Sequence, residues 1–279
     1  MLMRKIRKVL KWLGAMLLVF VISFLGTAAA NDSLSIDQIL TGTKQIASLG
    51  ENQVSQENRL SQGIDAMESN STLNRLKRVF FLKQAVNARI NSANYVKLQD
   101  IPESLQQAVV AVEDRKFYNH WGFDMEGIFR ASLVNLQYGQ VGEGASTITQ
   151  QLVKNLFLSQ EQTMGRKAEE FVLAMDMELN YSKDEILELY LNTIYFGSGY
   201  YGIKEASEGY FGKEPAMLAL PESAMLAGIP NAPSLYSPYV DFMLAKKRQF
   251  IVLDAMTAAG YLRESVANDA KIKPIYLAH

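Results

Sequence analysis

The N-terminal apolar run is the feature that most limits how this chain can fold. Residues 12–30, WLGAMLLVFVISFLGTAAA, carry no charge and approach the ~20 residues that span a bilayer as a helix. A basic cluster precedes the run: Arg4, Lys5, Arg7, Lys8 and Lys11. Because such clusters stay in the cytoplasm, the sequence predicts a single-pass anchor with the remainder outside. The alternative is a cleaved signal peptide ending at Ala28–Ala30, but the run exceeds the ~7–15 residues of a usual signal core, which favours the anchor.

Composition excludes several kinds of chemistry. The 279 residues contain no cysteine, so disulfides, thiolate metal sites and a cysteine nucleophile are ruled out. Only His120 and His279 are present, which excludes a histidine-rich metal site. The net charge of −1 gives no sign of a nucleic-acid partner. The hydrophobic content of 48% is enough for one good core with a small appendage.

Residues 31–94 form a polar spacer that is rich in Asn, Gln, Ser and Glu and has no proline. Its broken seven-residue apolar spacing indicates an amphipathic helix or a weak coiled coil. Basic residues surround an apolar patch at 79–82, which is compatible with contact to anionic lipid headgroups, although an ordinary half-buried helix is favoured slightly. Beyond the spacer no long alternating strand pattern occurs, so the body is predicted to be mainly α.

The stretch EDRKFYNHWGFD begins with a carboxylate on an apolar helical face. Pro102 lies near a plausible helix start, and Leu105, Val109 and Val112 share one face that Glu113 continues. A buried carboxylate is costly unless it is paired, so Glu113 is interpreted as a tuned acid or base in a cleft. The alternative is a surface glutamate at a fraying helix end.

A second candidate is GEGASTITQQLVKN, in which small residues lead into a helix. Free N–H groups at a helix start favour binding of an anion or a sugar, and Lys154 adds a cation one turn later. The sequence lacks the G-K-[ST] ending of a Walker loop. A turn with a helix cap is the more common role of such a loop. The polar side chains of interest here are Ser146, Thr147, Thr149, Gln150 and Gln151.

The segment 163–179 predicts another helix, with Thr163 as N-cap and a second carboxylate on its apolar face. Glu170 lies among apolar residues, with Arg166 one turn earlier and Lys167 three residues earlier. An ion pair at a helix edge would explain this equally well. Two carboxylates on apolar faces together favour a cleft with acidic chemistry and an anionic ligand.

The remaining sequence predicts further helices. Ser182 and Glu185 have capping-box spacing at the start of a helix that ends near Asn192. The aromatic and glycine-rich residues that follow are compatible with a sugar or lipid groove, although a core role is more common. A helix and a proline-punctuated loop follow at 220–239, and a last helix is expected from about Asp241, with Arg248 among its packing residues.

Five segments in order resemble the motifs of the peptidoglycan glycosyltransferases, glycosyltransferase family 51: EDRKFYNHWGFD, GASTITQQ, RKAEE, KDEILELYLN and RQFIVL. The resemblance covers roughly Tyr95 to Thr257. It implies a mainly α, lysozyme-like, two-lobed domain at 95–279, after an anchor at 1–30 and the spacer at 31–94. The rest of the chain is too short for the penicillin-binding domain of the bifunctional relatives, so the monofunctional form is expected.

The resemblance also implies an activity, polymerisation of lipid II into β-1,4-linked glycan with inversion and loss of undecaprenyl pyrophosphate. Glu113 would be the general base on the acceptor 4-hydroxyl, supported by Asp114, and Glu170 would act on the donor side. Lys154, Arg166, Lys167 and Arg130 would bind pyrophosphate. Ser146, Thr147, Gln150 and Gln151 would line the donor pocket, and Asn192 is a further substrate-binding candidate. No cofactor is required for this scheme, and a divalent cation, Mg or Mn, near Glu170 stays open.

The expected partners are lipid II, the growing glycan strand, membrane lipid and other cell-wall synthesis proteins, with no nucleic acid. The expected location is the bacterial cytoplasmic membrane, with the catalytic domain outside, and moenomycin should inhibit. One departure is Gln162, where family members commonly carry a basic residue. The alternatives are a glycan-cleaving enzyme on the same scaffold and a catalytically silent membrane scaffold.

Overall fold

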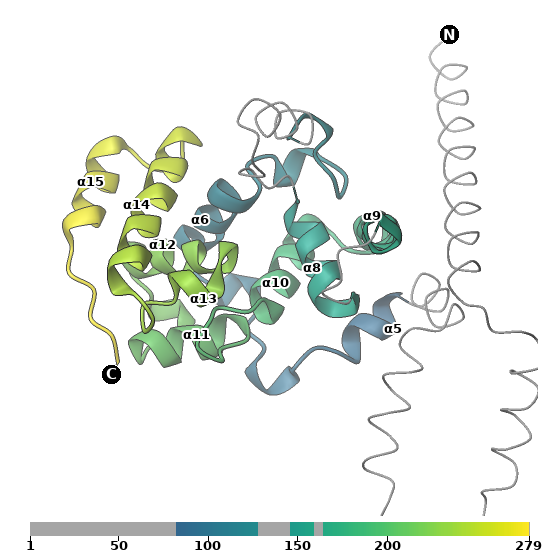
Figure 1. The fold of residues 1–279 in the computed structure, drawn as a ribbon, viewed down its shortest axis with the longest axis horizontal. Helices are drawn as coiled ribbons and strands as arrows, with labels where there is room; N and C mark the ends of the chain where they lie inside the picture. The colour runs from purple at the N-terminus through teal and green to yellow at the C-terminus, as the bar shows by residue number, and fades with distance from the viewer. Residues whose placement is uncertain (1–81, 128–145, 159–163, 279) are drawn as a thin grey trace, which may run out of the picture. The chain divides into compact units, whose positions relative to one another are not determined.

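The computed structural model describes residues 82–127, 146–158 and 164–278 (Figure 1). The predicted anchor at 12–30, most of the spacer, Arg130, Gln162 and Thr163 lie outside these ranges. Within them, no helix combines the length and the apolar character needed to cross a bilayer. Residues 82–127, 146–158 and 170–278 belong to one compact unit, whereas the first turns of α9, residues 164–169, belong to another.

The described part of the chain is helical, as predicted, and its only β feature is an isolated bridge between Tyr195 and Tyr201. The α-helices are α5 (Leu82–Asn87), α6 (Glu103–Glu113), α8 (Ile148–Phe157), α9 (Met164–Asn180), α10 (Lys183–Thr193), α11 (Gly202–Phe211), α12 (Leu220–Gly228), α13 (Pro233–Tyr236), α14 (Phe242–Ala258) and α15 (Glu264–Ile272). Short 3₁₀ turns connect them: η1 (Ser92–Asn94), η2 (Leu98–Asp100), η3 (Phe117–Asn119), η4 (Pro215–Met217) and η5 (Ile229–Asn231).

One sequence prediction about the helices was wrong. The helix that begins after Asp241 is confirmed as α14, with the Asp241 side chain accepting the N–H of Leu244, but it is not the last helix. α15 follows it and packs against α14. The sequence of α15 is mostly polar, and only Ala267 and Ala270 are buried, so it lacks the apolar periodicity that reveals a helix.

The core is organised around α12. Every residue from Pro221 to Gly228 is buried, and the helix packs against both α6 and α14, which also contact each other (Figure 1). A helix that is buried all round presents mainly apolar or small side chains, as LPESAMLAG does apart from Glu222, whose carboxylate is paired with Lys213 at 2.6 Å. This packing places the C-terminal end of α6, and therefore Glu113, beside α14.

A second group of helices forms around α8 and α10, which pack against each other. The predicted capping box at Ser182 is confirmed at the start of α10. Glu178 of α9 joins the N-terminal ends of both helices, because its Oε1 accepts hydrogen bonds from Thr149 Oγ1 at 2.6 Å and from Lys183 Nζ at 2.8 Å. The Lys183 ammonium also lies 4.5 Å from the centroid of the Phe117 ring.

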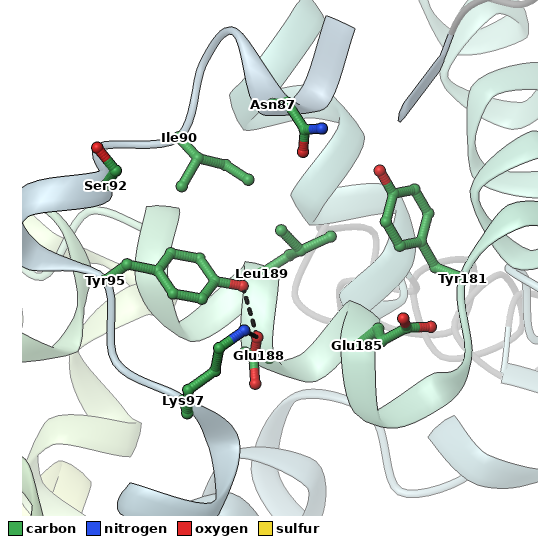
Figure 2. Close-up of a pocket in the computed structure, with 9 residues that line it drawn as sticks. All are labelled: Asn87, Ile90, Ser92, Tyr95, Lys97, Tyr181, Glu185, Glu188 and Leu189. Atoms are coloured by element: carbon green, nitrogen blue, oxygen red, sulfur yellow. Dashed lines mark hydrogen bonds and ion pairs between the residues drawn. The ribbon is translucent and has the colours of Figure 1, made fainter. Parts of the chain in front are cut away.

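The segment that enters this unit is held against α10. We call residues 94–98 the N-terminal strap. Glu188 accepts bonds from the Tyr95 hydroxyl at 2.8 Å and the Leu98 N–H at 2.7 Å, and the Asn192 side chain bonds to both the N–H and the carbonyl of Val96. Figure 2 shows Tyr95 and Lys97 converging on Glu188 at one side of a cavity of about 580 Å³. Two side chains of one helix thus fix the strap.

Candidate active site

Glu113 is the last residue of α6, and its side chain is only 7% exposed. The side-chain amide of Gln151 in α8 donates a 2.8 Å hydrogen bond to its Oε2. Its Oε1 is buried and has no hydrogen-bond partner within the described residues. One carboxylate oxygen is therefore fixed, while the other can accept a proton from a ligand.

Opposing influences act on the proton affinity of Glu113. Burial raises the pKa of this carboxyl above its ordinary value of 4.5, whereas the Gln151 hydrogen bond and the charge of Arg248 lower it, and the charge of Asp114 raises it. The net pKa is raised. A carboxylate whose pKa is raised by burial takes up a proton more readily than a solvated one, as general base chemistry requires.

Arg248 is the residue beside Glu113 that the sequence reasoning left out of the candidate site, since it was interpreted as a packing residue of α14. Its guanidinium lies 3.9 Å from Glu113 Oε1, and the side chain is only 13% exposed. Its Nε donates to the carbonyl of Gly228 at 3.4 Å, and the guanidinium lies 5.6 Å from the centroid of the Tyr236 ring. The available signal was its place on the apolar stripe with Val252, which mirrors the placement of Glu113.

Gly228 makes room for this arginine. A Cβ atom at position 228 would lie 2.8 Å from Cγ of Arg248, closer than such atoms approach in real structures. The end of α12 therefore has to be a glycine for the arginine stem to cross it in this conformation. The same crossing directs the guanidinium toward α6.

Asp114, predicted to support Glu113 and to bind substrate, is buried and holds the surrounding backbone in place. His120 Nε2 lies 2.9 Å from both of its carboxylate oxygens, and the Ile148 N–H donates to Oδ2 at 3.0 Å. The aspartate thus links the loop after α6 to the first residue of α8. These contacts give the carboxylate beside Glu113 a structural role, and its predicted substrate-binding role stays a prediction.

The α8 residues divide between structural and site roles. Thr147 and Gln150 form a capping box and are buried, and Thr147 Oγ1 also donates to the Gly122 carbonyl at 2.7 Å. The Ile148 N–H donates to Asp114, and the Gln150 N–H donates to the Thr147 hydroxyl. These two N–H groups at the start of α8 are therefore already bonded within the protein. Ser146 is exposed. The predicted donor-pocket roles of Ser146, Thr147 and Gln150 stay predictions.

Gln151 is the α8 residue that reaches Glu113. The Tyr190 hydroxyl, on α10, donates to Gln151 Oε1 at 3.1 Å, which leaves the amide nitrogen pointing at Glu113. The chain Tyr190–Gln151–Glu113 therefore fixes the orientation of the glutamine amide. The sequence identified Gln151 as a site residue but gave no reason to join it to Tyr190.

The other predicted residues lie as follows. Glu170 is buried in α9, on the face that carries Leu173 and Met177. Arg166 is half-buried and Lys167 is exposed, in the turns of α9 that belong to the other compact unit. Lys154 is half-buried in α8, and Asn192 binds the strap backbone as described above. The described residues hold no group of three or more His, Cys, Asp or Glu side chains that could bind a metal ion.

The described helices thus hold a buried glutamate that accepts a hydrogen bond from an amide and faces an arginine. The family model described as Transglycosylase matches residues 82–257, so the chain belongs to the transglycosylase family, as its five motifs indicate. The match confirms the resemblance to the peptidoglycan glycosyltransferases.

Two relatives found by sequence agree with this assignment, and one solved structure overlaps part of the chain. Penicillin-binding protein 1A of Aquifex aeolicus is 45% identical over 181 residues, which cover 65% of this chain and 25% of that protein. Penicillin-binding protein 1A of Neisseria gonorrhoeae is 50% identical over 162 residues, or 58% of this chain and 20% of that protein. A crystal structure of penicillin-binding protein 1A from Haemophilus influenzae overlaps 66% of this chain and 18% of that chain, with 26% identity and a TM-score of 0.41. The chain thus matches a quarter or less of the length of these relatives.

Proposed function

We propose that this peptidoglycan glycosyltransferase polymerises lipid II into β-1,4-linked glycan strands, with Glu113 as the general base. The observation that carries the proposal is the buried Oε1 of Glu113, which lacks a hydrogen-bond partner in the described part of the chain while Oε2 is held by Gln151. A hydroxyl group placed at Oε1 would complete the hydrogen bonding of the carboxylate. That hydroxyl would be the acceptor sugar's 4-hydroxyl, which loses its proton as it attacks.

The reaction is a single displacement. Glu113 takes the proton as the acceptor oxygen attacks the anomeric carbon of the donor MurNAc, and undecaprenyl pyrophosphate leaves with inversion. Gln151 and Tyr190 hold the carboxylate in one orientation, so reorganisation during proton transfer is small. Arg248 favours the ionised form of Glu113 before the proton arrives, and its charge balances the site.

Negative charge builds up on the pyrophosphate as it leaves, so nearby cations are needed to stabilise it. Lys154 is the candidate on α8, one turn from Gln151. Arg166, Lys167 and Arg130 are the further candidates, and Glu170 would orient them. A divalent cation near Glu170 would need most of its ligands from the pyrophosphate itself, because the described residues offer no cluster of three acidic or histidine ligands.

A second function deserves a test because of one observation. The raised pKa of Glu113 would also suit the general acid of a glycan-cleaving enzyme. Arg248 argues against this role, because a nearby cation favours the ionised carboxylate that a base requires. A catalytically silent scaffold would have no need for the Gln151–Glu113–Arg248 arrangement.

Incubation of the purified full-length chain with labelled lipid II separates these functions. We expect long glycan products that disappear in Glu113→Gln and persist in Glu103→Gln, a matched change at an exposed position of the same helix. Moenomycin should inhibit the reaction. Degradation of preformed glycan without polymerisation would identify a cleaving enzyme, and absence of both activities would favour the scaffold. If Glu113→Gln still formed polymer, Glu113 would not be the general base.

The location of the enzyme follows from its substrate. Lipid II is membrane-bound, so we propose that residues 12–30 anchor the chain in the bacterial cytoplasmic membrane in a single pass, with the catalytic domain outside. The basic cluster that precedes this run supports that orientation. Resistance of the membrane-bound protein to alkaline extraction, and digestion of its catalytic domain by protease in spheroplasts, would test both parts. Membrane lipid and other cell-wall synthesis proteins are the expected partners.

A further inference from the structure

A cavity lined by polar, charged and aromatic side chains lies where α8 and α10 end and α11 begins. Its volume is about 580 Å³, and it is separate from the Glu113 site. Its walls include Asn155 near the end of α8, Thr193 at the end of α10, and the aromatic pair Tyr195 and Tyr201. Asn91 contributes a further amide from the loop that precedes the strap. The Glu113 site uses none of these side chains.

The aromatic pair offers a flat face to a ligand. The Tyr195 and Tyr201 rings lie 4.7 Å apart between centroids, and Tyr201 is 60% exposed. Gly202 sets the backbone at this point, because its φ is +79° and a Cβ there would lie 2.6 Å from the Asn192 carbonyl oxygen. The start of α11 is thereby pressed against the end of α10, which holds Tyr201 at the rim of the cavity.

The polar groups favour a ligand rich in hydroxyl groups. The Asn155 and Tyr201 side chains are exposed, and among the described residues neither the Asn155 amide nor the Tyr201 hydroxyl has a hydrogen-bond partner, so both can donate to and accept from a ligand that replaces solvent. Helices α8 and α10 both end at this cavity, to which they contribute Asn155 and Thr193. Sites that bind a polar ligand with one apolar face typically combine amides, hydroxyls and an exposed aromatic ring.

Charge argues against a phosphate or a cationic ligand. The ionisable residues of the cavity wall are Arg89, Glu205 and the two tyrosines, so its formal charge is +1 − 1 = 0 at neutral pH. The guanidinium of Arg89 lies 5.0 Å from the centroid of the Phe157 ring, and Glu205 accepts bonds from the Asn94 side chain and the Tyr201 N–H. Both charges are therefore engaged within the protein. A neutral sugar ring, with hydroxyls at its edge and C–H groups on its face, fits this balance.

The position of the cavity connects it to the reaction. Asn155 lies four residues after Gln151, on the same side of α8, which corresponds to a rise of about 6 Å. Thr193 lies three residues after Tyr190 on α10. Both helices that hold the Glu113 amide network therefore lead to this cavity within about one turn.

We propose that this cavity is a sugar-binding subsite that holds the growing glycan strand beyond the reacting rings. The proposal rests on the proposed glycosyltransferase function for the identity of the strand. The ring of Tyr201 would stack on one sugar face, and Asn155 would bond to its hydroxyls. Such a subsite retains the product between additions, so it raises the number of sugars joined per encounter.

Binding can be tested without the reaction. The probe is a β-1,4-linked N-acetylglucosamine tetrasaccharide, titrated into the full-length chain in detergent by calorimetry. We expect Tyr201→Ala and Asn155→Ala each to weaken binding about tenfold, a loss equal to about 1.4 kcal/mol. Tyr201→Phe, which keeps the ring, should stay within about threefold of the unmodified chain. Tyr276→Ala, which removes a tyrosine that is 78% exposed near the C-terminus, is the matched control and should leave binding unchanged.

Two further measurements separate this proposal from the proposed function. Glu113→Gln should abolish polymerisation and leave tetrasaccharide affinity unchanged, and Tyr201→Ala should polymerise lipid II into shorter strands than Tyr276→Ala does. Tetrasaccharide binding that depends on Tyr201 in a chain that makes no polymer would overturn the proposed function and leave the sugar subsite standing. The subsite would be overturned if polymerisation depended on Glu113 while tetrasaccharide binding was unaffected by changes at Tyr201 and Asn155. It would also be overturned if Tyr201→Ala made strands of unchanged length. Displacement of the tetrasaccharide by inorganic pyrophosphate alone would also overturn it.

Discussion

The contact between Arg248 and Glu113 gives the sharpest prediction about the site. Replacement by Gln removes the cation and keeps most of the side-chain length. At 3.9 Å and an effective dielectric constant of about 20, the gross attraction is about 4 kcal/mol. Desolvation of both groups reduces the net value, so we expect a coupling free energy of about 1–3 kcal/mol between positions 113 and 248.

Two assays measure this coupling. Urea titrations of the unmodified chain, Glu113→Gln, Arg248→Gln and the double variant at neutral pH give the coupling free energy from a double-mutant cycle. The pH dependence of lipid II polymerisation gives an independent measure. Loss of the cation removes an influence that lowers the pKa of Glu113, so the acid limb of the profile should move to higher pH in Arg248→Gln.

The control is Lys247→Gln, which removes one charge from an exposed neighbouring position of α14 and should leave the acid limb in place. A coupling free energy below about 0.5 kcal/mol, which is the usual limit for independent sites, would refute the ion pair as described. An acid limb that stays in place, or moves to lower pH, in Arg248→Gln would refute the assignment of that limb to Glu113.

Three other changes have definite expected outcomes. Glu113→Gln should raise the free energy of unfolding at neutral pH by roughly 1–3 kcal/mol, because burial of the charge, with no hydrogen bond to Oε1 among the described residues, outweighs the attraction of Arg248. Since the folded pKa is raised, the unmodified chain loses stability as pH rises from about 4.5 through that pKa, so the gain should vanish below pH 4.5 in urea titrations. Gly228→Ala should lower the free energy of unfolding by about 1–2 kcal/mol, seen as a lower Tm, and should also lower the polymerisation rate, because the new Cβ displaces the side-chain stem of Arg248. An unchanged polymerisation rate would contradict the described path of Arg248 over Gly228. Glu178→Gln should lower the free energy of unfolding, measured by thermal unfolding, by about 2 kcal/mol, because Lys183 loses its buried partner. The control Glu264→Gln, at an exposed site, should leave the free energy of unfolding unchanged.

Local sequence signals predicted the helices and one carboxylate well. Pro102 as a helix start and the spacing of Leu105 and Val109 predicted a helix here, which the structure shows as α6 (Glu103–Glu113), and the side chain of Glu113 is buried at its end. Ser182 with Glu185 predicted the start of α10. These features depend on residues within one or two turns of each other, which is the range that helical periodicity and capping rules describe.

The partners of Glu113 could not be predicted in the same way. Gln151 and Arg248 come from helices that lie 38 and 135 positions further along the chain, and only the packing of α6 against α14 and of α8 against α10 brings them into place. The helix-start donors that suggested an anion site in α8 are partly used by Asp114 and Thr147, again through a contact between separate segments. Periodicity within one helix carries no information about which faces meet.

The N-terminal strap has a mechanical consequence. Glu188 and Asn192, which hold the strap, flank Tyr190 on α10, and the Tyr190 hydroxyl orients the amide of Gln151 against Glu113. The strap and the residue that orients the Gln151 amide are therefore attached to the same helix. A shift of α10 would change both the seating of the strap and the hydrogen bond that reaches Glu113.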